Sequence, residues 1–433
     1  MFVHVVKAGE TLYSIAELYD GTAERIRAAN QLQGDDIVPG MGLIIPAGPS
    51  TTLERYVIQP GDTLESISQQ KKLPPFIVRA SNERFAEQSL EPGKTIWLPV
   101  PVRSHRLIDV HAFLIPTGSE LDEEILHDTA DCLTFADLFS YQVQRDGTLS
   151  DLSDAKALSK MRQERVGAFA TITNFDGSQF NPELARWIIK DRQLRRQTIQ
   201  NILHLVQSKG HYGINIDFEH LYPQDRAYFT AFVRELSECA QPQKIPVAVT
   251  SGPKTADNPS NPWVGAYDYP ALGQIADQII LLTFEWGWAG GPPMAIAPLH
   301  MIQKVICYAS SVMPADKIFM GMALYGYNWP MPFREGQRAA GISPQASIQQ
   351  AVRANTHIHF HPESASPTFV YRGADQELRQ VWFEDARSIL AKLHLVQEHG
   401  LRGISYWMLG HSFPQNWTIL QDTFKVRKVF FRT

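Results

Sequence analysis

The segment that decides the fold is Gly213-Ile214-Asn215-Ile216-Asp217-Phe218-Glu219, in which apolar and polar residues alternate over seven positions. A period of two is typical of a β-strand, whose successive side chains point to opposite faces. One face then carries the apolar side chains, and the other carries Asn215, Asp217 and Glu219. Two carboxylates at positions i and i+2 of a strand have Cα atoms only about 7 Å apart. Such close like charges raise each other's pKa, which makes this strand a candidate for acid–base chemistry.

Two interpretations of this strand are open. It could be a surface strand whose polar face meets water. The apolar residues that follow Gly213 instead favour a buried strand of a parallel barrel, with polar groups at the C-terminal end where barrels place catalytic side chains. We adopt the second interpretation, in which one carboxylic acid is a general acid and its neighbour assists it.

Composition places the chain among ordinary globular proteins. It has 433 residues, enough for two or three domains, with 44% hydrophobic and 20% charged residues. The net charge of −5 gives no reason to expect nucleic acid or an anionic membrane as a partner. No apolar run reaches the length of a membrane span. The 3 cysteines are too widely spaced to predict a disulfide framework or a zinc site.

The first residues of the chain do not resemble a secretory signal. Met1-Phe2-Val3-His4-Val5-Val6 runs directly into Lys7 without a basic region, a long apolar region or a cleavage site. We therefore expect that the chain as given is not exported by such a signal.

An internal repeat occupies roughly the first hundred residues. Gly9-Glu10-Thr11-Leu12 recurs as Gly61-Asp62-Thr63-Leu64, and Asn30 recurs as Asn82 at the same spacing. Each copy is predicted to run strand, helix, helix, strand, with Thr11 as a helix cap in the first copy. We expect the copies at residues 2–47 and 54–100.

Both copies resemble LysM domains, small βααβ modules that bind glycans containing N-acetylglucosamine. The shared features are the Gly-Asp/Glu-Thr-Leu turn, a Ser-Ile pair that opens the first helix, the Asn and a terminal Pro. Glu10 replaces the usual Asp in the first copy. The resemblance implies a shallow sugar groove between two loops of each copy. By position, it assigns glycan binding to Gly9, Glu10, Thr11, Leu12 and Asn30, and to Gly61, Asp62, Thr63, Leu64 and Asn82.

From Leu107 onward, strand-like and helical segments alternate, which indicates an α/β fold with a parallel sheet. Eight such units predict a (β/α)8 TIM barrel over residues 105–427, with Asp217 and Glu219 at the end of the fourth strand. The eight candidate strands are residues 107–114, 133–139, 167–173, 213–219, 246–251, 278–284, 318–324 and 403–407.

Amphipathic helices are expected between these strands, one from Asn181-Pro182 to near Gly210 and another over residues 224–239. The connection after the seventh strand is unusually long. We expect a small α/β insertion at about residues 329–380, forming one wall of a cleft, and then a helix that begins near Trp382. His357, His359 and His361 alternate in this insertion and could face a metal, but no Cys or carboxylate partner is evident. No metal and no other cofactor are predicted.

The barrel resembles glycoside hydrolase family 18, whose fourth strand carries the motif Asp-Gly-x-Asp-x-Asp-x-Glu. Aligned on Glu219, this chain keeps the last two acidic positions, whereas Tyr212 and Asn215 replace the two leading Asp residues. Residues 323–327 resemble the family's seventh-strand motif, and residues 403–407 resemble its eighth strand. Nearly the whole chain is similar to the spore-cortex-lytic N-acetylglucosaminidases of spore-forming bacteria, notably through residues 285–293 and 382–388.

A glycosidase ordinarily uses two carboxyl groups on opposite sides of the scissile bond. Asp217 and Glu219 share one strand face, so the nucleophile must come from elsewhere, and family 18 is the substrate-assisted exception. The resemblance implies that the sugar's 2-acetamido oxygen attacks C1. Glu219 would be the general acid and then the base, while Asp217 would hold the acetamido N–H. Tyr325 would hydrogen-bond the acetyl oxygen or a sugar hydroxyl, and Trp407 would stack under the sugar.

Further substrate-binding candidates are Asn215, Phe284, Glu285 and Trp286. Phe284 stands where the family has a Tyr, so another group must orient the acetyl oxygen, and Glu285 is the nearest polar residue in sequence. We also expect Asn215 to donate an N–H to Asp217 and to favour its charged form.

The expected substrate is a polymer that displays β-linked N-acetylglucosamine, namely peptidoglycan of the spore cortex. A chitinase is an alternative, because chitin displays the same sugar. A catalytically inactive glycan-binding protein is another, although such family members typically lack the acid that Glu219 supplies. The resemblance favours a protein made in the mother cell and assembled onto the spore coat or cortex, and otherwise a cytoplasmic one. The sequence predicts neither exo or endo action nor the oligomeric state.

Overall fold

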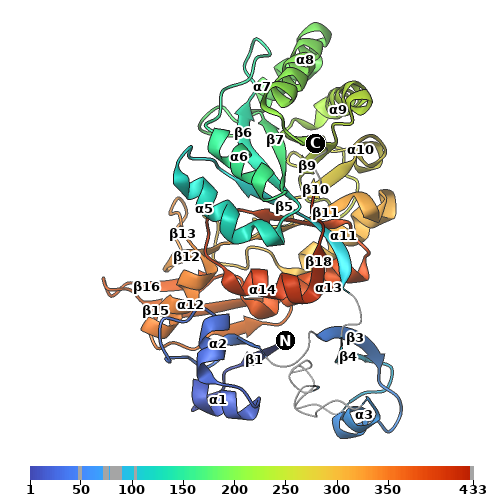
Figure 1. The fold of residues 1–433 in the computed structure, drawn as a ribbon. Helices are drawn as coiled ribbons and strands as arrows, with labels where there is room; N and C mark the ends of the chain where they lie inside the picture. The colour runs from blue at the N-terminus through green and yellow to red at the C-terminus, as the bar shows by residue number, and fades with distance from the viewer. Residues whose placement is uncertain (47–50, 72–77, 79–89, 102–104, 430–433) are drawn as a thin grey trace.

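The computed structural model describes residues 1–46, 51–71, 78, 90–101 and 105–429. Within these residues, eight parallel strands form a closed barrel with helices around it (Figure 1). Each strand pairs with the next along the chain, and the last pairs with the first, which closes the sheet. The predicted TIM barrel is confirmed. The barrel strands are β5 (Arg106–Leu114), β6 (Phe135–Gln142), β7 (Gly167–Thr173), β8 (Gly213–Asp217), β9 (Val247–Ser251), β10 (Gln278–Leu281), β11 (Ile318–Ala323) and β17 (Gly403–Trp407).

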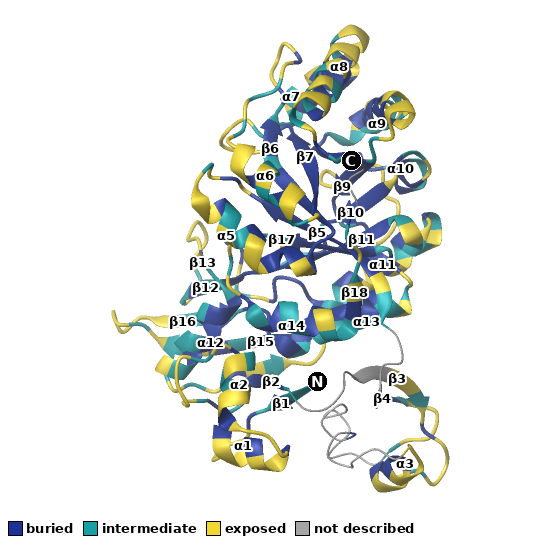
Figure 2. Cartoon of the chain, viewed as in Figure 1, coloured by how far each residue is buried: buried dark blue, intermediate teal, exposed yellow. Residues whose placement is uncertain are grey.

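Helices cover the outside of the barrel, and their buried faces meet the strands while their other faces are exposed (Figure 2). A short strand near the C-terminus, β18 (Phe424–Val426), pairs with β5. Within the described ranges, no helix combines the length and the apolar character needed to cross a membrane. The outer helices are α5 (Glu120–Thr129), α6 (Ala155–Gln163), α7 (Pro182–Lys190), α8 (Arg192–Lys209), α9 (Arg226–Ala240), α10 (Tyr269–Ile275), α11 (Leu299–Val312), α13 (Ala386–Glu398) and α14 (Pro414–Thr423), with 3-10 turns η2 (Ala130–Cys132), η3 (Pro223–Asp225), η4 (Gln241–Gln243) and η5 (Ala315–Lys317).

The prediction of a single helix from Asn181 to near Gly210 is wrong, because the helix is interrupted at Asp191. The Asp191 backbone is extended, with φ −75° and ψ 120°, and it separates α7 from α8. Its side chain accepts a hydrogen bond of 2.8 Å from the Leu194 amide and caps the second helix. Aspartate favours such a cap because its carboxylate satisfies an amide that has no partner within the helix.

The long connection after β11 contains the expected small α/β insertion. Five antiparallel strands lie in the order β13-β12-β16-β15-β14, with one helix beside them. The helix expected near Trp382 begins later, because Trp382 ends β16 and Asp385 caps α13. The elements of the insertion are β12 (Gly326–Met331), β13 (Ala340–Ile342), α12 (Pro344–Arg353), β14 (His359–His361), β15 (Ser366–Arg372) and β16 (Leu378–Trp382).

The first repeat has the predicted strand–helix–helix–strand order, in β1 (Phe2–Val5), α1 (Leu12–Leu18), α2 (Ala23–Ala29) and β2 (Gly42–Ile45). Thr11 caps α1 through the Ser14 amide, as expected. The core of this repeat is shared with the insertion: Leu43 lies in one apolar cluster with Phe369 and Val381.

Polar contacts also join the first repeat to the barrel body. Gln345 Nε2 donates to the carbonyl oxygens of Asn30 and Gln31, at 3.1 and 2.8 Å. Gln415 Nε2 donates to Asn30 Oδ1 at 2.7 Å and to the Gly42 carbonyl at 2.9 Å. The first repeat is therefore packed as part of the catalytic body.

The second repeat is described in part, as β3 (Thr51–Val57), α3 (Leu64–Lys71) and β4 (Thr95–Pro101). Its second predicted helix and Asn82 lie outside the described residues. Its described apolar cluster contains only residues of this repeat, among them Leu64, Ile67, Ile96 and Leu98. The two copies therefore differ in what surrounds their cores.

Candidate active site

Glu219 follows the end of β8, and two neighbouring elements hold its backbone. The Glu219 amide donates to Asn174 Oδ1, and Asn174 Nδ2 donates to the Glu219 carbonyl, both at 2.9 Å. These side-chain bonds replace the strand ladder, so β8 ends at Asp217 and not at Glu219 as predicted. The Glu219 side chain is half-buried. Burial, with repulsion from Glu285, raises its pKa to about 7, which keeps the acid protonated near neutral pH.

Asp217 lies inside the barrel mouth with its side chain buried. Its Oδ1 atom has no hydrogen-bond partner within the described residues. Burial raises the pKa of Asp217 well above its usual value, and repulsion from Glu219 and Asp137 adds to the shift. A buried carboxylate with an unpaired oxygen can accept the N–H of a substrate amide, which is the role predicted for it.

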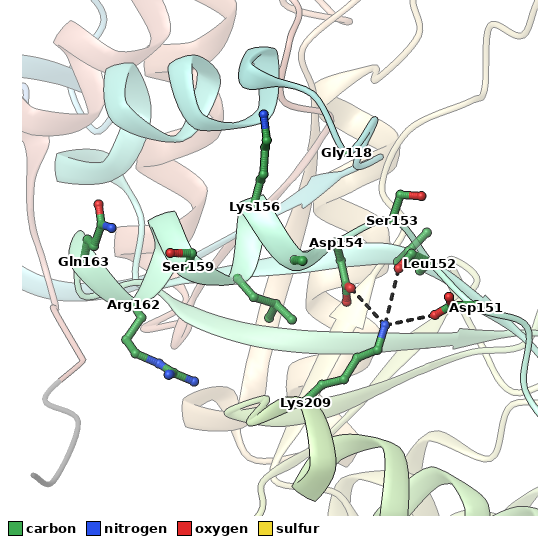
Figure 3. Close-up of a pocket in the computed structure, with 12 residues that line it drawn as sticks. Gly118, Asp151, Leu152, Ser153, Asp154, Lys156, Ser159, Arg162, Gln163 and Lys209 are labelled. Carbon is green, nitrogen blue, oxygen red and sulfur yellow. Dashed lines mark hydrogen bonds and ion pairs between the residues drawn. The ribbon is translucent and has the colours of Figure 1, made fainter.

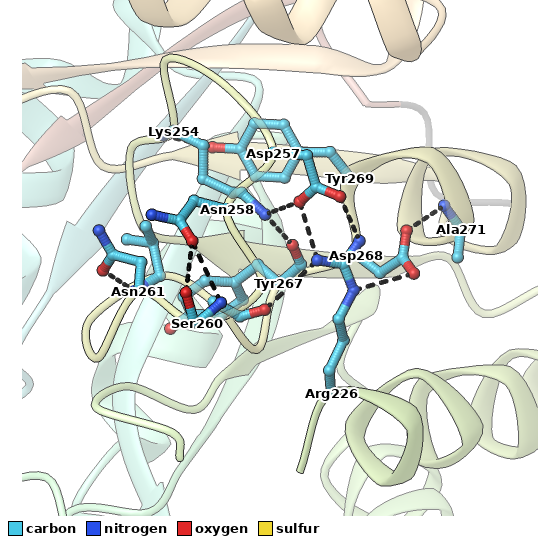
Figure 4. Close-up of polar contacts among 12 residues, drawn as sticks. Arg226, Lys254, Asp257, Asn258, Ser260, Asn261, Tyr267, Asp268, Tyr269 and Ala271 are labelled. Atoms are coloured by element: carbon cyan, nitrogen blue, oxygen red, sulfur yellow. Dashed lines mark hydrogen bonds and ion pairs between the residues drawn. The ribbon is translucent and has the colours of Figure 1, made fainter. Parts of the chain in front are cut away.

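A network on the loop between β9 and α10 fixes the residue between the two acids. Tyr267 donates its hydroxyl to the Phe218 carbonyl at 2.8 Å. Buried Lys254 donates to the Tyr267 carbonyl at 2.7 Å and to Asp257 at 2.6 Å, while Arg226 binds Asp257 through two nitrogens (Figure 4). The loop that positions the acidic pair is therefore itself held by the buried charge of Lys254 and by the ion pair between part-buried Arg226 and exposed Asp257.

Glu285 and two tyrosines form a second polar group at the barrel mouth. Tyr325 and Tyr327 both donate their hydroxyls to Glu285 Oε1, the latter at 2.9 Å. Partial burial raises the pKa of Glu285, although these two hydrogen bonds lower it. Glu285 and its hydrogen-bond partner Tyr325 belong to the acidic site, since repulsion from Glu285 contributes to the raised pKa of Glu219.

Trp407 lies at the end of β17, between the barrel core and the second polar group. Its ring centroid is 5.2 Å from that of Phe113 and 5.0 Å from that of Phe139. It also packs in one apolar cluster with Tyr325 and Phe284. Trp286, by contrast, packs against the main core between strands and helices. The structure thus joins Phe284 and Trp407 and leaves Trp286 outside this cluster.

The hydrogen bond expected from Asn215 to Asp217 is wrong. Asn215 Nδ2 donates to Asp137 Oδ1 at 3.1 Å, and Asn215 Oδ1 accepts from the Thr250 hydroxyl at 3.0 Å. The barrel curvature brings β6 and β9 to the inward face of β8, so both amide groups are used across the barrel. Asp137 is a third buried carboxylate that the sequence reasoning missed.

Several other residues of the site escaped prediction, and each has a weak sequence signal. His111 and Asp137 are polar residues inside otherwise apolar strand segments, at positions that alternate inward. Asn174 and Tyr267 lie on loops, where periodicity gives no information. His111 in β5 and Asp137 in β6 were therefore the sequence signal from which further polar residues inside the barrel could have been predicted.

The repeat residues assigned to glycan binding build the turns of the two repeats. Glu10 Oε2 accepts the Lys7 amide at 2.7 Å, and Asp62 Oδ2 accepts the Gln59 amide at the same distance. Thr11 and Thr63 cap α1 and α3, Leu12 and Leu64 enter the cores, and Gly9 and Gly61 adopt positive φ. The side chain of Asn30 is fully buried and bonded to Ile44 and Gln415, so only neighbours such as Asp35 are exposed. Glycan binding by these segments stays a prediction.

An open groove elsewhere on the barrel is lined by residues such as Asp151, Asp154, Arg162 and Lys209 (Figure 3). None of the candidate site residues lines it. Within the described part of the chain, no group of three or more His, Cys, Asp or Glu residues could hold a metal ion. The histidines of the insertion do not form such a group, and the rings of His357 and His359 stack at 4.4 Å.

An acid with a raised pKa and a buried carboxylate lie beside an aromatic cluster at the carboxyl ends of the barrel strands, an arrangement that suits acid catalysis on a sugar. The profile of glycosyl hydrolases family 18 matches residues 126–411, and that of the LysM domain matches residues 4–46 and 56–99. The chain belongs to glycosyl hydrolases family 18, as a glycosidase that carries two LysM domains.

The similarity to known relatives extends over the full length of the chain. The chain is 36% identical to the cortical fragment-lytic enzyme of Bacillus subtilis, over 100% of both chains. The crystal structures of the spore cortex-lytic enzyme SleL from Bacillus cereus and Bacillus megaterium are similar, with TM-scores of 0.85 and 0.84. Their identities to this chain are 34% and 31%, and the alignments cover 98% and 99% of each chain.

Proposed function

We propose that this chain hydrolyses the β-linked N-acetylglucosamine bonds of peptidoglycan from the spore cortex. The observation that carries the proposal is the acidic pair at the end of β8, in a chain similar over its full length to enzymes named for lysis of cortical fragments. Both acids are on one strand end, so the substrate's own acetamido group supplies the nucleophile.

In this mechanism, Glu219 protonates the leaving oxygen while the 2-acetamido oxygen attacks C1. Asp217 accepts the acetamido N–H through its unpaired oxygen and stabilises the positive charge that develops. Glu219, now ionised, then removes a proton from water, which opens the oxazolinium ion with retention. Trp407 supports the sugar ring, and the hydroxyl of Tyr325, already at the site, holds the acetyl oxygen or a sugar hydroxyl.

The test is digestion of purified cortex fragments and of chitin oligomers side by side, followed by mass spectrometry of the reduced products. We expect new reducing ends on N-acetylglucosamine in the cortex digest. New reducing ends on N-acetylmuramic acid would refute the assigned bond. Hydrolysis of chitin alone would favour the chitinase, and binding without any hydrolysis would favour the inactive glycan-binding protein.

We also propose that the protein acts at the spore, since the names of the similar proteins place their substrate there. A fluorescent fusion expressed from the native promoter should label the forming spore. A signal that stays diffuse in the mother cell after the spore is complete would contradict this location.

A further inference from the structure

A chain of five polar side chains crosses the centre of the barrel beneath the acidic pair. Gln278 Oε1 lies 2.7 Å from His111 Nε2, and His111 Nδ1 lies 2.7 Å from Asp137 Oδ2. Asp137 Oδ1 accepts from Asn215, which in turn accepts from Thr250. All five side chains are buried, and the mechanism above uses none of them. Buried polar groups of this kind need a physical reason to be there.

The surroundings of His111 favour its protonated form. Both ring nitrogens face oxygen atoms that accept hydrogen bonds, one from a carboxylate and one from an amide. An imidazole can donate from both nitrogens only as the imidazolium ion. The ring is also enclosed by three phenylalanines, Phe135, Phe169 and Phe319, with centroids at 4.6, 4.9 and 4.7 Å. An aromatic ring attracts a cation that lies over its face, so the protonated form is inferred from the two hydrogen bonds.

Asp137, whose carboxylate faces His111 Nδ1, also affects the acidic pair at the barrel mouth. Its carboxylate repels the ionised form of Asp217, which is one cause of the raised pKa of that group. Asn215 stands where the family motif has the second of its four acidic residues, so a third carboxylate beside Asp217 and Glu219 comes from β6, as Asp137. Asn215 connects the two, because it donates to Asp137 and lies two residues before Asp217 on the same strand face.

We propose that His111 is a buried imidazolium paired with Asp137, and that this pair is a positioning device that sets when Asp217 takes up a proton. The inference rests on the proposed function for its catalytic consequence but not for the charge state of His111. The other ionisable groups around Asp217 are Glu219 after β8 and Tyr267 before α10, with Glu285 beyond Glu219. Phe319, one of the three phenylalanines around His111, also has a charged neighbour: Arg402 lies 5.5 Å from its ring and binds Asp109.

The first test measures the charge of His111 directly, by nitrogen NMR of the full chain with labelled histidine. His111→Gln identifies the resonance, and we expect both ring nitrogens to be protonated at neutral pH. A neutral imidazole at neutral pH, with Gln278 turned so that its amide donates, would overturn the assignment. This result does not depend on whether any glycan is cleaved.

The second test measures the pH dependence of kcat/KM on soluble glycan fragments for Asp137→Asn. Removing the negative charge makes ionised Asp217 easier to form, so we expect the acidic limb to move to lower pH by roughly one unit. Asp154→Asn is the matched control, because Asp154 is a buried carboxylate directly before α6. It accepts hydrogen bonds from Tyr141 and from Lys209, and Figure 3 shows the contact with Lys209.

The control variant should lose stability without moving either limb. An unmoved acidic limb in folded Asp137→Asn would overturn the positioning role. If Asp137→Asn does not fold, the double variant with His111→Gln, which leaves neither charge buried alone, is measured for a shift in the same direction, which is smaller because the positive charge is removed as well. A wild-type chain that cleaves no fragment would instead refute the proposed function and leave the NMR result standing.

Discussion

In the proposed mechanism the chemistry depends on Glu219, whose raised pKa keeps a transferable proton near neutral pH. We predict that Glu219→Gln abolishes hydrolysis and leaves glycan binding nearly intact, since the amide keeps the shape and loses the proton. General acid catalysis typically contributes on the order of 10²–10⁴-fold. Activity is measured on soluble fragments, with the exposed Glu398→Gln as control. A variant that keeps a tenth of wild-type activity would remove Glu219 from this role.

Glu285 affects the reaction through the charge it places near Glu219. The acid works only while protonated, so activity is present at low pH and is lost as pH rises through the Glu219 pKa of about 7. Glu285→Gln removes the repulsion, lowers the pKa of Glu219 and should move the alkaline limb of kcat/KM to lower pH. A limb that stays in place would show that the two carboxylates are not coupled.

Asn215 is the position where the chain departs from the family motif. Asn215→Asp would face Asp137 with a like charge and crowd the strand with a further acid next to Asp217. We predict that this raises the pKa of Asp217 and moves the acidic limb of the kcat/KM profile to higher pH. If neither limb moves, Asn215 is a packing residue with no part in the proton network.

The sequence was sufficient to predict Asp217 and Glu219 because their alternation is local. It was not sufficient to predict the partners of Asn215, since Asp137 is distant along the chain and approaches only when the barrel closes. The same limit applies to Tyr267, whose hydroxyl reaches Phe218 from a loop without periodicity. The sequence was therefore enough to predict a local acidic pair, but not which residues distant along the chain contact each other.

At the scale of elements, the eight strands followed from the alternating pattern and the insertion from the length of the connection after the seventh strand, whereas the helix break at Asp191 was not predicted. An aspartate within an amphipathic segment does not reveal whether its backbone is helical, because a cap and a surface position share that residue type. The docking of the first repeat was also not predictable, since a LysM copy has the same internal pattern whether or not another domain covers it.

The duplication supplies a matched pair of variants for that docking. Gly40 and Gly93 both have positive φ, but a Cβ at Gly40 would lie 1.8 Å from the Ile358 carbonyl oxygen, while a Cβ at Gly93 would meet no described atom within 4 Å. Left-handed backbone costs a residue such as Ala about 1–2 kcal/mol at either site. We predict that Gly40→Ala lowers the melting temperature clearly more than Gly93→Ala, as read by calorimetry. Equal losses would mean that the first repeat is loosely attached.

At the scale of the whole molecule, the repeats should add affinity for an insoluble polymer. Deleting residues 1–100 should weaken pelleting with cortex, since linked sites can raise apparent affinity by roughly 10²–10⁴ when the polymer engages both. The deletion also uncovers apolar residues such as Phe369 and Val381, so lower thermal stability is expected as well. The rates are therefore compared at a temperature where the truncated chain is folded. Equal losses on soluble and insoluble substrate under that condition would contradict the role in affinity.

The contact between the first repeat and the body has a consequence for protein engineering. Two copies of one module began with the same plan, yet one shares its core with the insertion while the other keeps its own. They are no longer interchangeable parts. A chimera that joins this barrel to a foreign binding module should keep residues 1–46 and exchange only the second copy, because the described apolar cluster of that copy contains only its own residues.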